Sequence, residues 1–150
     1  MPWRAELSRL QGIVCALQAQ VYTLSPGTTA PGDAIAGLFA CVPNSIAVGD
    51  VVCELVAGTL CDRASAASAD TAAVGVCLQL VNPALALIVY NGELLIFSGL
   101  TPDAIYYLDV APGGLTAVAP SAVGQIVQKI GRAKNSTTLV VEVTPQFIQL

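Results

Sequence analysis

The chain has 150 residues, of which 55% are hydrophobic and only 11% are charged, and its formal net charge at pH 7 is −4. Soluble domains usually carry about 25% charged residues, so a monomer of this composition would expose large apolar areas, which usually mark interfaces. Histidine is absent, which excludes Ser–His and Cys–His catalysis, and the six cations form no basic patch for nucleic acid.

An amphipathic helix over residues 1–24 is the first predicted element. Apolar residues recur there at alternating spacings of four and three residues: Trp3, Leu7, Leu10, Val14, Leu17, Val21 and Leu24. A period of 3.5 residues keeps the apolar side of a helix against a partner only when the helices supercoil. We therefore expect an oligomerising coiled coil, and Ile13 widens the apolar stripe enough to favour three chains or more. The alternative is a helix folded back on its own domain.

Residues 25–33 are predicted to be a linker, because two Pro-Gly pairs in nine residues end the helix and do not fit a central strand. The remaining domain, residues 34–150, alternates short β-prone runs with turn signals. This spacing is typical of a β-barrel or β-sandwich, so we expect a mainly β chain. The candidate strands are 38–42, 51–56, 74–81, 85–90, 93–98, 105–109, 124–130 and 137–143.

Two turn signals predict hairpins within this domain. Residues 71–92 lack charge and are long enough for a membrane helix, but Asn82-Pro83 interrupts them and favours two strands. Asn91-Gly92 between apolar runs is the strongest hairpin signal, since both residues tolerate positive φ. The small-residue stretch 64–73 is expected to be a surface loop or one helical turn.

Few side chains suggest catalysis or metal binding. The odd number of cysteines and their spacing do not match a zinc site, so we interpret them as small buried hydrophobic residues in a reducing cytosol. Glu54 and Asp62 could face each other across a hairpin as a glycosidase pair, which leaves a carboxylate hydrolase as a minor alternative. We therefore expect no enzyme activity, no cofactor and no metal. The cysteines are Cys15, Cys41, Cys53, Cys61 and Cys77.

Several segments resemble small β domains of tailed-bacteriophage virion proteins, which include head decoration (cement), head-fibre and some tail-fibre proteins. Residues 98–108 (SGLTPDAIYYL) and 112–116 (PGGLT) carry the resemblance. Residues 46–52 are similar to the opening of those domains, and residues 123–131 and 137–141 are similar to their closing strands. The resemblance spans about residues 34–143, although Asp103 stands where the family more often has glycine. It implies a trimeric β-domain protein without catalytic residues.

Tyr106 and Tyr107 are the candidate partner contacts within the resembling block. Adjacent strand residues point to opposite faces, so one ring can fill the core while the other meets a neighbour. Ordinary strand packing of both rings is the alternative.

The expected function is that of a trimeric capsid decoration protein, made in the host cytoplasm and located on the capsid surface of the virion. Its expected partners are further copies of itself and the major capsid protein, without nucleic acid or membrane. The alternative is a short head or tail fibre that attaches to the host surface.

Overall fold

The described part of the chain, residues 35–55 and 60–150 of a computed structural model, is built almost entirely from β-strands. A single 3₁₀ turn, η1 (Ala69–Thr71), is the one helical element within it. The strands are β1 (Ile35–Ala40), β2 (Val51–Glu54), β3 (Cys61–Arg63), β4 (Ala73–Asn82), β5 (Leu85–Leu94), β6 (Ile105–Leu108), β7 (Leu115–Thr116), β8 (Ile126–Val127), β9 (Lys129–Ala133), β10 (Leu139–Glu142) and β11 (Ile148–Gln149).

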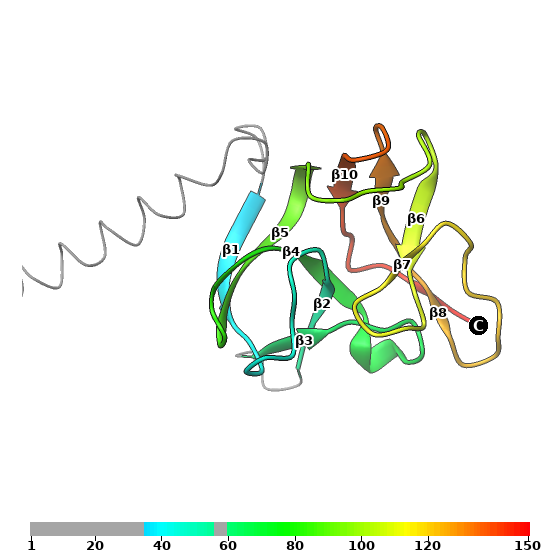
Figure 1. The fold of residues 1–150 in the computed structure, drawn as a ribbon. Coiled ribbons are helices and arrows are strands. Elements are labelled where there is room, and N and C mark those ends of the chain that lie inside the picture. Colours follow the sequence, from blue (N-terminus) through cyan, green and yellow to red (C-terminus); the bar gives the residue numbers. More distant parts are fainter. Residues whose placement is uncertain (1–34, 56–59) are drawn as a thin grey trace, which may run out of the picture.

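The main sheet is antiparallel and curls into about half of a barrel (Figure 1). Its strand order is β3-β2-β4-β5-β10-β9-β6-β7, with β1 added to β5, while β8 and β11 form a separate two-stranded sheet. The prediction of a mainly β domain is therefore confirmed, as a curled sheet rather than two sheets packed face to face. The predicted coiled coil over 1–24 and the linker 25–33 lie outside the described residues.

The uncharged stretch 71–92 forms most of the β4–β5 hairpin, as the Asn82-Pro83 signal predicted. Asn82 pairs with Leu85, and the Asn82 carboxamide oxygen accepts a hydrogen bond from the Ala84 amide at 2.8 Å. The proline ring fits this turn because a turn position needs no strand hydrogen bond there. No helix within residues 35–55 and 60–150 combines the length and the apolar character needed to cross a bilayer.

The hairpin predicted at Asn91-Gly92 is wrong, because β5 runs straight through it. At Asn91 the strand changes partner: its first part pairs with β1, and residues from Asn91 onward pair with β10. Gly92 takes a φ of 139° at this exchange, a conformation that side chains other than glycine rarely adopt. The same local signal therefore marks a branch in the sheet instead of a turn.

The central strands are buried on both faces, which explains why their sequences are nearly continuous in hydrophobic residues. In β5, Leu87 and Val89 belong to the larger core inside the curl, while Ala86 and Ile88 belong to a second core on the other face. The second core is completed by residues from β2, β3, β4 and the segment after β1: Cys41, Ile46, Val52, Cys61 and Cys77.

The small-residue stretch 64–73 differs from the predicted surface loop. Ala64 and Ala66 have no exposed surface and belong to the larger core. Ser65 donates a hydrogen bond from its hydroxyl to the Val110 carbonyl oxygen at 2.7 Å. Small side chains are needed here because the chain passes through the core, and only the turn η1 matches the expectation.

Gln128, between β8 and β9, connects distant parts of the curled sheet by hydrogen bonds within the core. Its side chain is fully buried, accepts a hydrogen bond from the Ala73 amide at 2.7 Å, and donates to the Ala73 carbonyl at 2.9 Å. The same amide group donates to the Thr144 carbonyl at 2.8 Å. One side chain thus joins the start of β4 to the segment after β10.

Candidate interaction surfaces

The two tyrosines of the resembling block have different environments. Tyr106 is 8% exposed and belongs to the larger core, and its hydroxyl oxygen accepts a hydrogen bond from the Thr101 amide at 3.0 Å. Tyr107 is half-buried on the other face of β6, opposite Lys129 of β9. Tyr106 therefore serves packing, and only Tyr107 has a ring within reach of a partner.

The turn before β6 explains why a glycine suits position 103. Asp103 has a φ of 64°, in the left-handed region that favours glycine. Aspartate is among the residues that tolerate this region, and Arg132 holds it there. The Arg132 guanidinium donates from Nη2 to the Asp103 carboxylate at 2.9 Å and from Nε to its carbonyl oxygen at 3.2 Å.

The PGGLT segment, residues 112–116, holds the start of β2 in place. Gly113 has a φ of 76°, and a methyl group on it would come within 3.1 Å of both Asp50 and Arg63. Its amide donates to the Ala64 carbonyl at 2.7 Å, and its carbonyl accepts from the Val51 amide at 3.0 Å. Residues 46–52 and 112–116 are therefore in direct contact, and Gly113 allows their close packing.

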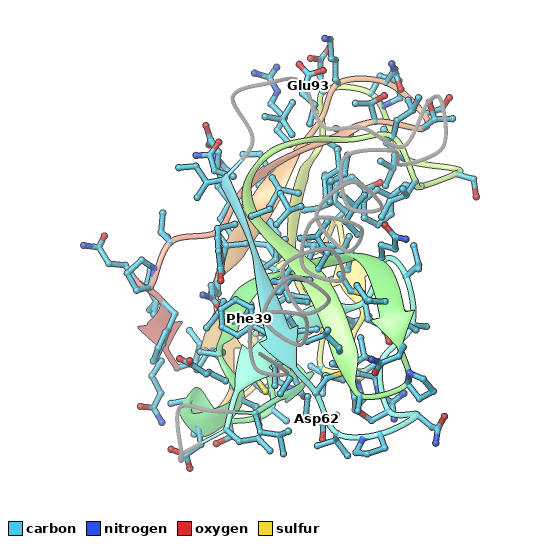
Figure 2. The ribbon with its side chains drawn as sticks, turned by 90° about the vertical axis from the view of Figure 1, so that its left-hand side faces the viewer. Phe39, Asp62 and Glu93 are labelled. Atoms are coloured by element: carbon cyan, nitrogen blue, oxygen red, sulfur yellow. The ribbon has the colours of Figure 1, made fainter. Side chains whose placement is uncertain are left out.

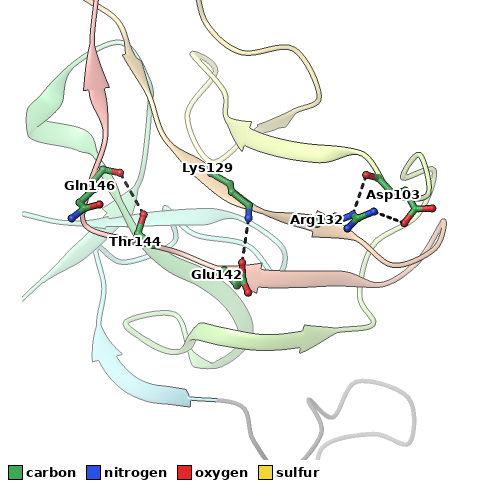
Figure 3. A network of polar contacts seen from close by, with 6 residues as sticks. All are labelled: Asp103, Lys129, Arg132, Glu142, Thr144 and Gln146. Atoms are coloured by element: carbon green, nitrogen blue, oxygen red, sulfur yellow. Dashed lines mark hydrogen bonds and ion pairs between the residues drawn. The ribbon is translucent and has the colours of Figure 1, made fainter.

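Three ion pairs are found at the outer side of β9 and its neighbours. Arg132 pairs with Asp103, and Lys129 pairs with Glu142 at 3.2 Å (Figure 3). Lys134 pairs with Glu93 at 3.0 Å. An open groove of about 380 Å³ lies here, bordered by all of these residues except Glu93, together with Ala133 and Val140. Since every cation there is matched by a carboxylate, the face carries no net charge and is suited to contact with water.

The first of two exposed apolar surfaces is the exposed face of β1, which by the strand register is the face that Leu87 and Val89 occupy in β5. Ala36, Leu38 and Ala40 alternate on the exposed side, and Leu38 is 50% exposed. Gly37 and Phe39 turn toward the second core, where the Phe39 and Tyr90 rings meet edge to face with centroids 5.8 Å apart. Figure 2 views the molecule from this side, with Phe39 on the strand.

The second exposed apolar surface, here called the C-terminal surface, lies on and beside the two-stranded sheet of β8 and β11. It consists of Val123, which is 95% exposed, together with Phe147, Ile148 and Leu150. The Leu150 amide donates to the Gln125 carbonyl, and its carbonyl accepts from the Gly124 amide, both at 2.9 Å. These hydrogen bonds bring the chain end beside Val123. Figure 1 shows β1 and this end of the chain on opposite sides of the molecule.

The proposed carboxylate pair is not formed. In the β2–β3 pairing, Asp62 lies opposite Cys53, and Glu54 lies opposite Cys61. Paired residues share a face and successive residues alternate, so the two carboxylates project to opposite faces. This register overturns the glycosidase arrangement. Within the described ranges no group of three or more histidine, cysteine or acidic residues could hold a metal ion.

Cys41, Cys53, Cys61 and Cys77 are buried and free, as their apolar sequence context predicted. Burial raises the pKa of the Cys77 thiol to about 12 and that of Cys61 to about 11, because the apolar surroundings disfavour the thiolate. These thiols are therefore poor nucleophiles and serve packing. Cys15 lies outside the described residues.

The predicted interface residues Trp3, Leu7, Leu10, Val14, Leu17, Val21 and Leu24 all lie outside the described residues. No prediction from the sequence pointed to Gln128, to the exposed side of β1 or to the C-terminal surface. The apolar run at 35–40 lacks any charge, which was a usable signal for the first surface. No protein-family model matches this chain, and a search of curated proteins found no significant match.

Proposed function

We propose that the chain is a structural virion protein that decorates a phage capsid as a trimer. The heptad pattern of residues 1–24 would join three copies, and the β domains would bind the outer surface of the shell. The proposal rests on the resemblance at residues 46–52, 98–108, 112–116, 123–131 and 137–141, together with the distribution of apolar and charged side chains over the β domain.

The observation that carries the proposal is the presence of two apolar surfaces without charged side chains on opposite sides of one small domain. Apolar patches of this kind usually mark contacts with other proteins. Two of them on opposite sides suit a protein that contacts copies of itself on one side and a different protein on the other. The ion-paired side of β9 then remains available to water.

Binding through three linked copies makes strong individual contacts unnecessary. Once one domain of a trimer is bound, the other two are held near their sites at a high effective concentration. The C-terminal surface can then bind through burial of Val123, Ile148 and Leu150, with few charges to desolvate. A shell under internal pressure from packaged DNA would be reinforced across its subunit junctions.

Imaging of purified particles tests the function directly. We expect many copies of the protein over the head surface, arranged in groups of three. A few copies confined to the tail or to one vertex would contradict decoration and support the fibre alternative. Particles without the protein at any position would contradict both.

A substitution in the C-terminal surface tests the mode of binding. Ile148→Asp is expected to lower the occupancy of the protein on particles at least tenfold, because a carboxylate would have to be desolvated at each contact. Leu95→Asp is the matched control, since Leu95 is also exposed but lies outside this surface. Both variants should keep the thermal stability of the wild type. Equal occupancy of the two variants would overturn the assignment of this surface.

A further inference from the structure

Strand β1 is an edge strand without the usual protection against association. It is hydrogen-bonded to β5 on one side, and within residues 35–55 and 60–150 no strand pairs with its other side. Its six residues, IAGLFA, include no charge and no proline. Natural edge strands normally carry lysine, proline or another feature that prevents pairing with a second chain.

The strand is also held firmly enough to present a defined surface. Phe39 packs against the second core and against the Tyr90 ring, and the register with β5 continues from Ala36 to Ala40 without interruption. A methyl group on Gly37 would lie 3.0 Å from a ring carbon of Phe39 and 3.0 Å from the Tyr90 hydroxyl oxygen, so the backbone lies close to both side chains. The side chains of Ala36, Leu38 and Ala40 therefore face outward from a fixed position.

Two charged residues lie toward the two ends of the side of the molecule that carries β1. Figure 2 shows Glu93 at one end of the view and Asp62 at the other, with β1 between them. Glu93 is already paired with Lys134. The six residues of β1 themselves are apolar and uncharged, which favours a partner surface of the same character.

The length of the chain before β1 favours another copy of this chain as that partner, given the proposed trimer. The heptad pattern ends at Leu24 and β1 begins at Ile35, so the ten residues 25–34 separate them. Ten residues span at most about 35 Å, so a bundle of the N-terminal segments would keep every β1 close to the bundle axis. Of all the exposed surfaces, β1 is the one directly attached to the predicted oligomerising segment.

We infer that the exposed side of β1, formed by Ala36, Leu38 and Ala40, is the contact between β domains in the assembled protein. Copies of the strand pack side chain to side chain around the axis that residues 1–24 define. Each Leu38 is then buried against the same residue of its neighbours. The inference rests on the proposed trimer and adds to it a second, independent interface.

The dissociation of the full-length chain tests this contact. Leu38→Asp is compared with the wild type and with Val123→Asp, an exposed apolar position at the other end of the molecule. The oligomer of the Leu38→Asp variant is expected to dissociate at a protein concentration at least tenfold higher than the oligomers of the other two proteins. The reason is that the substitution would bring carboxylates together in a contact that excludes water. Equal dissociation of all three proteins would overturn the β1 contact while leaving the trimer in place. A wild-type monomer would overturn both proposals.

Chemical cross-linking gives a second measurement that does not depend on destabilising the assembly. In a Cys15→Ser background, Leu38→Cys should be joined to a neighbouring chain by a short bismaleimide, while Val123→Cys should not. The four buried thiols do not compete, because the fold encloses them. Absence of linked chains from Leu38→Cys, or equal linking at Val123→Cys, would contradict the inference.

Discussion

At the scale of single residues, Asp103 shows how a turn tolerates an unfavourable backbone conformation. Its positive φ costs an ordinary side chain about 1–2 kcal/mol, and Arg132 provides only an exposed ion pair in return. Asp103→Gly should therefore unfold in urea within about 1 kcal/mol of the wild type. Asp103→Val should lose about 1–3 kcal/mol, because a β-branched residue fits the left-handed region poorly. Equal stability of Asp103→Val and the wild type would contradict this explanation.

Gln128 is the single residue whose substitution we expect to lower the stability most. Gln128→Leu removes three hydrogen bonds and leaves the Ala73 amide and the carbonyls of Ala73 and Thr144 without that partner. We expect the free energy of unfolding to fall by about 3 kcal/mol, measured by urea denaturation. Gln125→Leu is the control, since the Gln125 side chain makes one exposed hydrogen bond, to the Ala122 amide. A loss no larger than that of the control would show that Gln128 does not hold the curl closed.

At the scale of elements, β5 shows which features the sequence could predict. The β4–β5 hairpin was predictable because a long apolar run and an Asn-Pro turn are adjacent in the chain. The exchange of partners at Asn91-Gly92 was not, because it depends on β1 and β10, which are far away in the sequence. The same limit applies to Glu54 and Asp62, whose separation is decided by the register of β2 and β3.

The second core, between β1 and the central strands, contains buried thiols, and we therefore expect the domain to lose stability at alkaline pH. The folded state keeps the Cys61 and Cys77 thiols protonated up to a pKa of about 11 and about 12, while the unfolded chain ionises them at their ordinary, lower pKa. Their contribution to stability is therefore complete below the unfolded pKa and is lost as the pH rises through the folded values. Cys77→Ala should remove part of this dependence in urea denaturation at neutral and alkaline pH under reducing conditions. Identical pH profiles of the two proteins would rule out this role for Cys77.

At the scale of the whole molecule, composition and periodicity predicted a mainly β domain, and short-range signals placed most of its longer strands. The strands β3, β7 and β11 were missed because two or three residues carry no detectable period. The candidate surfaces were harder to predict, because exposure depends on tertiary packing. Leu38 and Phe39 are adjacent and both apolar, yet one faces solvent and the other a core.

The low charge content and the exposed apolar surfaces together explain why we expect this protein to associate with other chains. A chain with 11% charged residues and two exposed apolar surfaces needs neighbours to cover them. In the proposed assembly, the N-terminal segment and β1 meet other copies, and the C-terminal surface meets the shell. Each part of the account therefore depends on association of the full-length chain.

The most direct test of this central claim is the mass of the full-length chain in solution, measured by sedimentation equilibrium at micromolar concentration. The account predicts three times the 15.3 kDa mass of one chain. It further predicts a lower mass when residues 1–24 are removed, with the β domain still folded. A full-length protein that sediments as a single 15.3 kDa chain would contradict the account.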